Sequence, residues 1–479
     1  MLKLATLLVG FSLLLSGCAL FNTGGTNLKA ENMTLEFWGV FDASDAYDEI
    51  IAAYSQARPN IQIKYRKLRW DEYEKELLEA WAEDRGPDIF MVHNNWVGKY
   101  QTKIAAMPAV LKVPWLKQEK GAFKNRSVTV VDTVNMPSLE EMKDLFVPAV
   151  YGDTVRDGQI WGLPLAVDNL VLFYNRALLS ASNVVAPPKT WNELVTMTGQ
   201  ITKTDNGKLV RSAIAMGTAN NNNRFFDILS LLLMQQGALT VDNNGKVILD
   251  QTKAEKALDF YLDFAPRWQS NGNKILTTAY TWDDSVAPEA TDAFIQGKLA
   301  MMFGYIYQWP FLKAQAPNLD IAVTGVPHMV EGGADINKGV SINLANYWLL
   351  SAAKKTKHAN EVWDFIRFAT LGRSRTVDAN NQEVIKLRAE NYLENNNGNY
   401  AKLRTPALNE LISKYQKSND QRFQPGLGQV LTAQSWYRGK DAAGMENVFK
   451  QAINAVIYEN KETREVISGL WQAIQGINF

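Results

Sequence analysis

An alternation of strand and helix patterns near the start of the chain places the strongest limit on its fold. Residues 33–40, 61–65 and 88–92 have the apolar content and alternation that are typical of strands. Residues 46–57 and 71–83 lie between them and carry apolar side chains at helical spacing. Because strands separated by helices pair in parallel through right-handed crossovers, the sequence predicts an α/β fold with a covered sheet.

The rest of the chain continues this alternation. Ser138 with Glu141, and Thr190 with Glu193, have the spacing of capping boxes at helix starts. Segment 102–135 is less regular, and the last hundred residues are mainly helical. Further helices are predicted at 225–236, 253–268, 290–296, 359–369, 407–417, 442–458 and 464–474, and further strands at 170–174, 299–303, 321–326 and 348–352.

The only cysteine, Cys18, closes the run Leu15-Ser16-Gly17-Cys18 after an apolar stretch at residues 4–15. This stretch follows Lys3 and is shorter than the ~20 residues of a spanning helix. The run resembles a bacterial lipobox, in which the cysteine is diacylated and the preceding residues are removed. The resemblance implies a lipoprotein signal peptide at 1–17 and lipidation of Cys18. The alternative is an ordinary signal peptide with an incidental cysteine.

Residues 18–32 have little apolar periodicity and contain two adjacent glycines, so we expect a flexible tether. No later segment approaches the ~18 uninterrupted apolar residues of a membrane span. We therefore expect an extracytoplasmic protein whose contact with the cell membrane is the lipid on Cys18.

The charge balance and the few histidines give no support for a nucleic-acid partner or a metal site. The 50 basic residues balance the 50 acidic residues, which gives no reason to expect a nucleic-acid partner. The three histidines are far apart in the sequence, and nothing supports a zinc site or a Ser-His-Asp triad. We expect no metal and no cofactor.

Several short motifs occur in one order across most of the chain. They are LEFWG at 35–39, RPNI at 58–61, GPDI at 86–89, DGQIWGLP at 157–164, FYN at 173–175, PPKTWNEL at 187–194, FIQGKLAMM at 294–302 and VWDFI at 362–366. Together they resemble the extracellular solute-binding proteins of bacterial ABC importers, the family that includes the maltodextrin-binding proteins.

This resemblance implies a periplasmic-binding-protein-like fold of type II, with two α/β lobes joined by a hinge and a ligand held between them. The topology of the family implies an N-terminal lobe of 33–167 with 300–345, and a C-terminal lobe of 168–299 with 346–479. It also implies delivery of the ligand to the transmembrane subunits of an ABC transporter, with no catalysis.

Sugars present an apolar ring face and a rim of hydroxyl groups, which aromatic rings and carboxylates or amides recognise. In parallel sheets such side chains gather at the carboxyl ends of strands. By the resemblance, Asp42, Asp168 and Tyr307 match positions that line the sugar cleft. The candidate ligand-binding residues are Trp38, Asp42, Asn94, Asn95, Trp96, Asp168, Tyr305, Tyr307, Trp309, Asn346, Tyr347 and Trp436.

Some of these residues have a second interpretation. Trp38 alternates with Phe37 along a strand, so it faces either the core or the ligand. Asp42 is either a ligand contact or the N-cap of the helix that begins near Ala46. Tyr347 and Trp348 point to opposite faces of a strand, so only one of them should reach the cleft.

The sequence thus predicts a lipid-anchored protein that captures a mono- or oligosaccharide. A phosphorylated polyol, a peptide or a polyamine is an alternative ligand. Alternative functions are a surface lipoprotein that acts as a sensor or adhesin, and a secreted glycoside hydrolase. A hydrolase needs two carboxylates ~5–9.5 Å apart across the scissile bond. The adjacent pairs Asp283-Asp284 and Glu140-Glu141 do not suit that arrangement.

Overall fold

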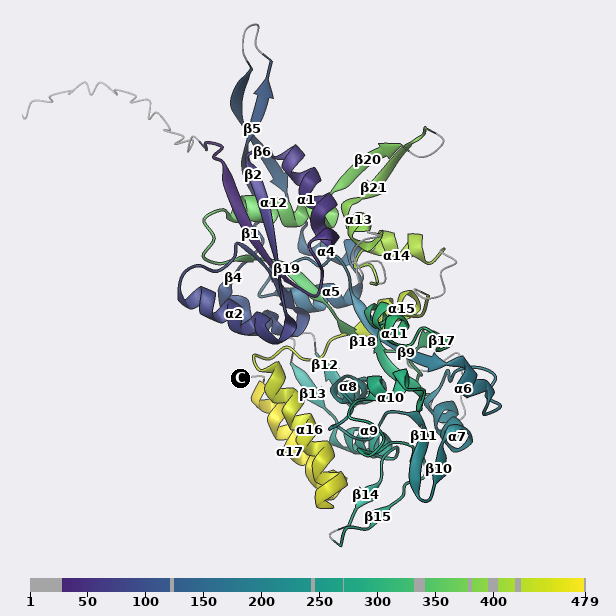
Figure 1. Ribbon diagram of the computed structural model, residues 1–479. Helices are drawn as coiled ribbons and strands as arrows, with labels where there is room; N and C mark the ends of the chain where they lie inside the picture. Colours follow the sequence, from purple (N-terminus) through teal and green to yellow (C-terminus); the bar gives the residue numbers. More distant parts are fainter. Residues whose placement is uncertain are drawn as a thin grey trace, which may run out of the picture.

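Two β-sheets, each packed against helices, form an upper and a lower lobe in the computed structural model of this chain (Figure 1). The structure describes residues 28–120, 125–242, 246–269, 271–330, 341–377, 381–394, 404–417 and 424–477. The predicted signal peptide, Cys18 and most of the predicted tether lie outside these residues.

The first lobe contains a five-stranded sheet in the order β2-β1-β3-β19-β4. β1 pairs in parallel with β2 and with β3, which confirms the predicted crossover units. β19 comes from a much later part of the chain and pairs antiparallel with β3. The strands are β1 (Met33–Val40), β2 (Ile61–Leu68), β3 (Ile89–His93), β4 (Ile104–Ala105) and β19 (Trp348–Ala353).

Helices bury both faces of this sheet. On one face, Phe37 of β1 meets Tyr47 of α1 at 5.1 Å and Phe365 of α12 at 6.2 Å between ring centroids. On the other face, Phe90 of β3 meets Trp81 of α2 at 5.1 Å. The helices of this lobe are α1 (Asp45–Ala57), α2 (Trp70–Ala82), α3 (Val97–Tyr100), α4 (Leu139–Leu145), α5 (Pro148–Thr154), α12 (Ala359–Leu371), α13 (Arg388–Glu394) and α14 (Asn409–Tyr415), with 3-10 turns η1 (Asn94–Trp96), η2 (Gln101–Lys103) and η6 (Val430–Thr432). The short helix α15 (Gln424–Gln429) packs instead on β9 and β17 of the second lobe.

The second lobe is built on a seven-stranded sheet in which β9 pairs with β16, β17 and β18. Its strands are β9 (Asp168–Asn175), β10 (Lys203–Asp205), β11 (Lys208–Ile214), β16 (Leu299–Tyr305), β17 (Ile321–Gly325), β18 (Asn343–Asn346) and β22 (Ala433–Gln434). Its helices are α6 (Arg176–Ser180), α7 (Trp191–Ile201), α8 (Phe225–Gln235), α9 (Gln251–Leu262), α10 (Ala290–Ile295), α11 (Trp309–Gln315), α16 (Ala442–Glu459) and α17 (Thr463–Ile477), with the 3-10 turn η3 (Ile306–Gln308).

Five two-stranded hairpins complete the fold, and β5–β6 and β20–β21 project from the first lobe (Figure 1). Two of them differ from the sequence-based expectation: β5–β6 occupies much of the less regular segment 102–135, and the predicted helix 253–268 ends at Leu262 before β14. Their strands are β5 (Val110–Glu119), β6 (Arg126–Asn135), β7 (Val155–Arg156), β8 (Gln159–Ile160), β12 (Leu239–Val241), β13 (Val247–Leu249), β14 (Arg267–Trp268), β15 (Lys274–Ile275), β20 (Arg373–Val377) and β21 (Glu383–Leu387).

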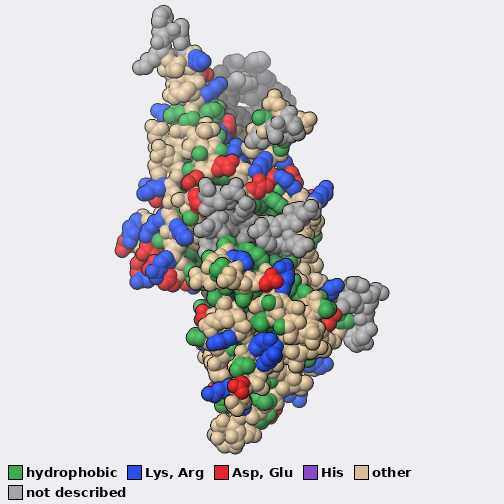
Figure 2. Space-filling view, turned by 45° about the vertical axis from the view of Figure 1, so that its right-hand side comes forward, with side chains coloured by type: hydrophobic (Ala, Val, Ile, Leu, Met, Phe, Trp, Pro, Cys, Tyr) green, Lys and Arg blue, Asp and Glu red, His purple; other side chains and the backbone are tan. Residues whose placement is uncertain are grey.

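Among the described helices, none has the length and the apolar character of a membrane span. On the face shown in Figure 2, basic and acidic side chains are interspersed over the first lobe and do not separate by sign.

The chain passes between the lobes at three neighbouring strands of the second sheet. β9 begins at Asp168, β18 ends at Asn346, and Ser435 follows β22. In the antiparallel register of β9 and β18, Asp168 lies opposite Asn346. The lobes are therefore joined at one place, where a hinge can act.

The lobe assignment expected for 300–345 is wrong. β16 and β17 both pair with β9, so this segment belongs to the second lobe. The assignment of 346–479 to the C-terminal lobe is wrong for its first part, because β19 pairs with β3 and α12 packs on β19 in the first lobe. A local pattern predicts a strand, but the partner of that strand is set by residues far away in the sequence.

Both predicted capping boxes are present, and the one at α7 gives a test of local stability. Thr190 Oγ1 accepts a hydrogen bond from Glu193 N at 3.2 Å, and Glu193 Oε2 accepts one from Thr190 N at 3.3 Å. We expect Thr190→Ala to lower the free energy of unfolding by about 1 kcal/mol, because the helix start loses its side-chain acceptor. Unfolding in urea measures this difference.

The matched control is Thr196→Ala on the exposed side of the same helix. Thr196 Oγ1 donates to Asn192 O, and alanine at this interior position has the higher helix propensity. Its free energy of unfolding should stay the same or rise slightly. An equal loss in both variants would show that the cap does not stabilise α7.

Candidate functional site

A cleft with a volume of about 720 Å³ lies between the lobes and is the candidate binding site. The first lobe contributes loops that follow the carboxyl ends of its parallel strands: Phe41 and Asp42 follow β1, and Asn95 and Trp96 follow β3. This is the strand-end position expected from the sequence. The other lining residues are Trp70, Glu74, His93, Lys99, Asp168, Asn223, Arg224, Phe226, Asp227, Tyr307, Gln308, Phe311, Asn346, Trp348, Arg404, Ala442, Ala443 and Glu446.

Aromatic rings form the first-lobe wall of the cleft. Trp70 stacks on Trp96, with 5.5 Å between ring centroids and 20° between planes. Trp348 meets the edges of both rings, at 5.5 Å from Trp70 and 5.4 Å from Trp96. Trp70 is 49% exposed although it is a tryptophan surrounded by other rings. An exposed aromatic wall of this kind offers a flat apolar surface to a ligand.

Phe41 holds its place in this wall through a strained turn. Its φ is 65°, and Asp42 N donates to Val40 O at 2.7 Å, so the three residues form a γ-turn with a positive central φ. A phenylalanine in this region of φ costs about 1–3 kcal/mol. Phe41 stacks on Trp70 at 5.9 Å and is 39% exposed. The strain and the exposure together indicate that the contacts of its ring are the reason for a phenylalanine at position 41.

Asp42 is a buried carboxylate in the cleft. Its Oδ2 accepts hydrogen bonds from the Tyr47 hydroxyl at 3.1 Å and the Tyr392 hydroxyl at 2.9 Å. Its Oδ1 has no partner among the described residues. Burial raises the pKa of Asp42, and the Arg404 guanidinium opposes that rise.

Asp168 is the second buried carboxylate, and it shares Arg404 with Asp42. Asp168 Oδ2 accepts from Arg404 Nε at 2.9 Å and from Nη2 at 2.8 Å, whereas Arg404 Nη1 is 3.9 Å from Asp42 Oδ2. Asp168 Oδ1 has no partner in the described part of the chain. Burial also raises the pKa of Asp168. Two carboxylates with one guanidinium leave acceptor capacity for a ligand that donates hydrogen bonds.

The second lobe supplies the facing wall. Arg224 Nη1 pairs with Asp227 Oδ2 at 3.1 Å, and Tyr307, Phe226 and the 43% exposed Phe311 add rings. On the first-lobe side, the His93 ring contacts Asn95 Oδ1 at 2.5 Å and Asn346 Oδ1 at 3.1 Å, and burial lowers the pKa of His93. The cleft therefore combines apolar faces with a polar rim.

A second hollow, of about 360 Å³, lies at the opposite edge of the first sheet. Its lining includes Thr34 near the start of β1, Asp88 before β3, and the exposed Lys354 and Lys357. It has one tryptophan, Trp81, and involves no residue of the second lobe. The inter-lobe cleft is twice as large and has convergent polar and aromatic groups, so it is the better candidate.

Six of the predicted site residues line the cleft. They are Asp42, Asn95, Trp96, Asp168, Tyr307 and Asn346. For Tyr347 and Trp348, the expectation that one of the two reaches the cleft holds for Trp348. Whether these side chains contact a ligand stays a prediction.

The other six do not line it. Trp38 lies on the face of β1 that α2 covers, with Arg66 Cζ 4.7 Å from its ring centroid. Trp309 packs towards Phe173 in the second lobe, and Trp436 stacks on Phe449 at 5.7 Å. Tyr305 is fully buried behind Tyr307. Trp38, Tyr305 and Trp436 are core residues because helices cover both faces of each sheet, and Trp309 is partly buried against the core.

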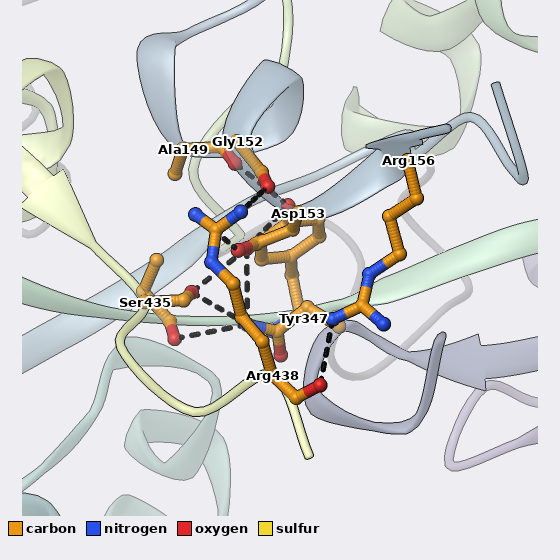
Figure 3. A network of polar contacts seen from close by, with 9 residues as sticks. Ala149, Gly152, Asp153, Arg156, Tyr347, Ser435 and Arg438 are labelled. Atoms are coloured by element: carbon orange, nitrogen blue, oxygen red, sulfur yellow. Dashed lines mark hydrogen bonds and ion pairs between the residues drawn. The ribbon is translucent and has the colours of Figure 1, made fainter. Parts of the chain in front are cut away.

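Asn94 and Tyr347 belong to a buried polar network around Asp153. Figure 3 shows Tyr347, Ser435 and Arg438 in this network. Asp153 Oδ2 accepts hydrogen bonds from Tyr347 OH at 2.9 Å, Ser435 Oγ at 2.7 Å and Asn94 Nδ2 at 3.2 Å. Arg438 donates to Gly152 O, and its own carbonyl accepts from Arg156 Nη2 at 2.8 Å. These hydrogen bonds hold the inter-lobe connections at Tyr347 and Ser435 against the first lobe. Asn94 and Tyr347, which were predicted to contact the ligand, therefore contact the hinge instead.

Sequence reasoning missed Trp70, Arg404 and Arg224. Trp70 could have been found, because it follows the carboxyl end of β2 and so obeys the same strand-end rule as Asp42. Arg404 and Arg224 lie in no motif, and only the tertiary structure brings them to the cleft.

Comparisons with known proteins agree with this architecture. The sequence profile of the family described as bacterial extracellular solute-binding protein matches residues 41–371. The diacetylchitobiose binding protein of Streptomyces coelicolor is 22% identical over 334 residues, which cover 68% of each chain. An ABC transporter solute-binding protein of Thermotoga lettingae, solved with α-D-tagatose, has a TM-score of 0.62 at 17% identity and covers 93% of this chain and 99% of its own. The sugar-binding protein MalE of Xanthomonas citri has a TM-score of 0.64 at 17% identity, with 93% and 97% covered. The structural likenesses show a periplasmic-binding-protein-like fold of type II.

The raised pKa of Asp42 predicts a pH-dependent gain in stability for Asp42→Asn. The carboxyl group of Asp42 keeps its proton up to a higher pH in the folded protein than in the unfolded chain. The free energy of unfolding therefore falls as the pH rises towards the folded-state pKa of this group. Asparagine cannot ionise, but its side-chain oxygen can still accept hydrogen bonds from the Tyr47 and Tyr392 hydroxyls. Arg404 remains paired with Asp168 in this variant.

The melting temperature of Asp42→Asn minus that of wild type should therefore increase between about pH 4 and pH 7, where an ordinary aspartate is already ionised. Thermal unfolding at several pH values, without ligand, measures the difference. A difference that shrinks as the pH rises would contradict a raised pKa at this site.

Proposed function

The chain belongs to the family of bacterial extracellular solute-binding proteins, and on this basis we propose that its solute is a sugar, a mono- or oligosaccharide, held in the inter-lobe cleft. The observation that supports this most directly is the pairing of an exposed aromatic wall with buried carboxylates. Trp70 and Phe41 offer flat apolar faces, and Asp42 and Asp168 add carboxylates to the lining of the cleft, each with a buried Oδ1 atom that has no partner among the described residues.

The names of similar proteins support the same ligand class. The Streptomyces relative is named for diacetylchitobiose, the Thermotoga protein was solved with α-D-tagatose, and the Xanthomonas protein is described as sugar-binding. We propose direct contacts with Asp42, Asn95, Trp96, Asp168, Tyr307 and Asn346, and add Trp70 to this set.

Binding follows from the two-lobe architecture. With the lobes apart, water fills the cleft and the solute exchanges freely. A solute that touches both walls makes more contacts when the lobes are together, so it shifts the population towards the closed form by bending at the three inter-lobe connections. No bond is made or broken in this step, and we propose that the protein is not an enzyme.

The closed, loaded protein would deliver the sugar to the transmembrane subunits of an ABC importer. We propose that it does so outside the cytoplasm, held at the cell membrane by diacylated Cys18. Two acyl chains give stable anchoring, whereas one gives marginal binding. Residues 18–32 would leave the two lobes free to reach the transporter.

Thermal-shift screening against a sugar library tests the ligand class, with secreted protein in which Cys18→Ser prevents lipidation. A sugar at a hundred times its dissociation constant should stabilise the fold by about 2.7 kcal/mol. The proposal would be contradicted if none of the sugars raised the melting temperature, or if the purified protein hydrolysed a chromogenic glycoside.

Trp70→Ala should weaken binding of that sugar by about fivefold, because it removes one stacking face worth roughly 1 kcal/mol. The control is Tyr458→Ala, which removes a 36% exposed ring outside the cleft. Isothermal titration should give wild-type affinity for Tyr458→Ala. Equal losses in both variants would place the sugar elsewhere.

Replacement of the thiol tests the anchor. Cys18→Ser should move the protein from the membrane fraction to the soluble extracytoplasmic fraction, because serine cannot form the thioether that carries the lipid. Ser16→Ala keeps the thiol and should remain with the membrane. Cys18→Ser protein that stays in the membrane fraction would show that lipid on this cysteine is not the anchor.

A further inference from the structure

A row of nearly parallel aromatic rings runs from one lobe into the other. In the second lobe, Tyr305 stacks on Tyr307 with 5.7 Å between centroids and 5° between planes. Tyr307 then faces Phe41 of the first lobe at 6.4 Å and 26°. The row continues in the first lobe through Trp70 and Trp96, each ring within 6 Å of the previous one and tilted by 20° or 21°.

Cations cover the two ends of this row. Arg224 Cζ lies 5.2 Å from the Tyr305 ring centroid, and Lys99 Nζ lies 6.0 Å from that of Trp96. Among the described residues, the Phe41–Tyr307 contact is the only ring-to-ring contact that joins the lobes. The row is therefore continuous only while the lobes are together.

The backbone at Phe41 indicates that this contact is the reason for a phenylalanine here. Every other described non-glycine residue with a positive φ is an aspartate or asparagine, which tolerate that conformation: Asp84, Asp157, Asn183, Asn206, Asn381 and Asn460. Phe41 is bulky, and its ring is too exposed to serve as core. The turn would form more easily with glycine, so the contacts of the ring compensate for the strain.

We propose that Phe41 is the residue that controls closure of the cleft, by docking its ring on Tyr307 and holding the lobes together before any solute binds. The γ-turn fixes the ring at the lip of the first lobe, where only a closed arrangement brings Tyr307 within reach. This role goes beyond the proposed sugar binding and does not depend on which solute the protein takes. A larger closed population without solute would also raise the apparent affinity, because the binding-competent fraction scales the dissociation constant.

Distances between spin labels in the protein without ligand test this role. The labels are attached to the substitutions Lys75→Cys in α2 and Gln451→Cys in α16. Both positions are exposed, and the two helices line the cleft from opposite lobes. The Cys18→Ser background contains no other cysteine. Phe41→Leu and Tyr307→Leu should each lower the ratio of closed to open protein by about threefold to tenfold, the equivalent of one ring contact.

Three further variants test whether the shift comes from the Phe41–Tyr307 contact. Tyr458→Leu removes a 36% exposed ring outside the cleft and should leave the unliganded distances unchanged. Phe41→Tyr keeps the ring and should restore the wild-type distribution. The double variant Phe41→Leu/Tyr307→Leu should shift no further than either single variant, because both remove the same contact.

A wild-type distance distribution in Phe41→Leu would overturn the proposal, and so would an equal shift in Tyr458→Leu. Because no sugar is present, these results are independent of the thermal-shift screen. A shift in Phe41→Leu together with a failed sugar screen would contradict the ligand class and leave the closure role standing.

Discussion

The pairing of β9 with β18 is the interaction on which the architecture depends. These strands and their neighbour β22 carry the three connections between the lobes, and their hydrogen bonds keep all three connections side by side. The register places Asp168 opposite Asn346 at the point where the chain changes lobes. Both side chains also line the cleft, so the same strand pair forms the hinge and the floor of the binding site.

Electrostatics at this floor is organised around Arg404. Two buried carboxylates would repel each other, and burial disfavours the charge on each of them. Arg404 is within hydrogen-bonding distance of Asp168 and of the Tyr392 hydroxyl, which in turn donates to Asp42. The network satisfies one oxygen of each carboxylate and leaves the other without a partner among the described residues. A site with spare acceptors in a cleft of aromatic rings suits a solute that is apolar on its faces and rich in hydroxyl groups at its edges. Around it, the Asp153 network holds the hinge connections to the first lobe, so the two lobes can move as rigid bodies.

Much of the fold could be predicted from the sequence. The three strands and two helices predicted between residues 33 and 92 and the capping boxes at Ser138 and Thr190 are present, apart from small shifts at the ends of the elements. The strand-end rule also brought Asp42, Asn95 and Trp96 to the cleft, because the side chains that follow parallel strands meet at one edge of the sheet. The same rule would have found Trp70. It could not exclude Trp38, which stands one strand position from Phe37 on a sheet that is covered on both faces.

Local periodicity and turn chemistry are written in neighbouring residues, so the sequence by itself determined which segments are strands and helices and which loops follow the strands. The tertiary structure alone decided that β16 pairs with β9 and β19 with β3, which moved 300–345 into the second lobe and the residues after 346 into the first. It also decided that Arg404 reaches the cleft and that Trp309 and Trp436 do not. These outcomes depend on hydrogen bonds and packing between segments far apart in the chain, and no local pattern contains that information.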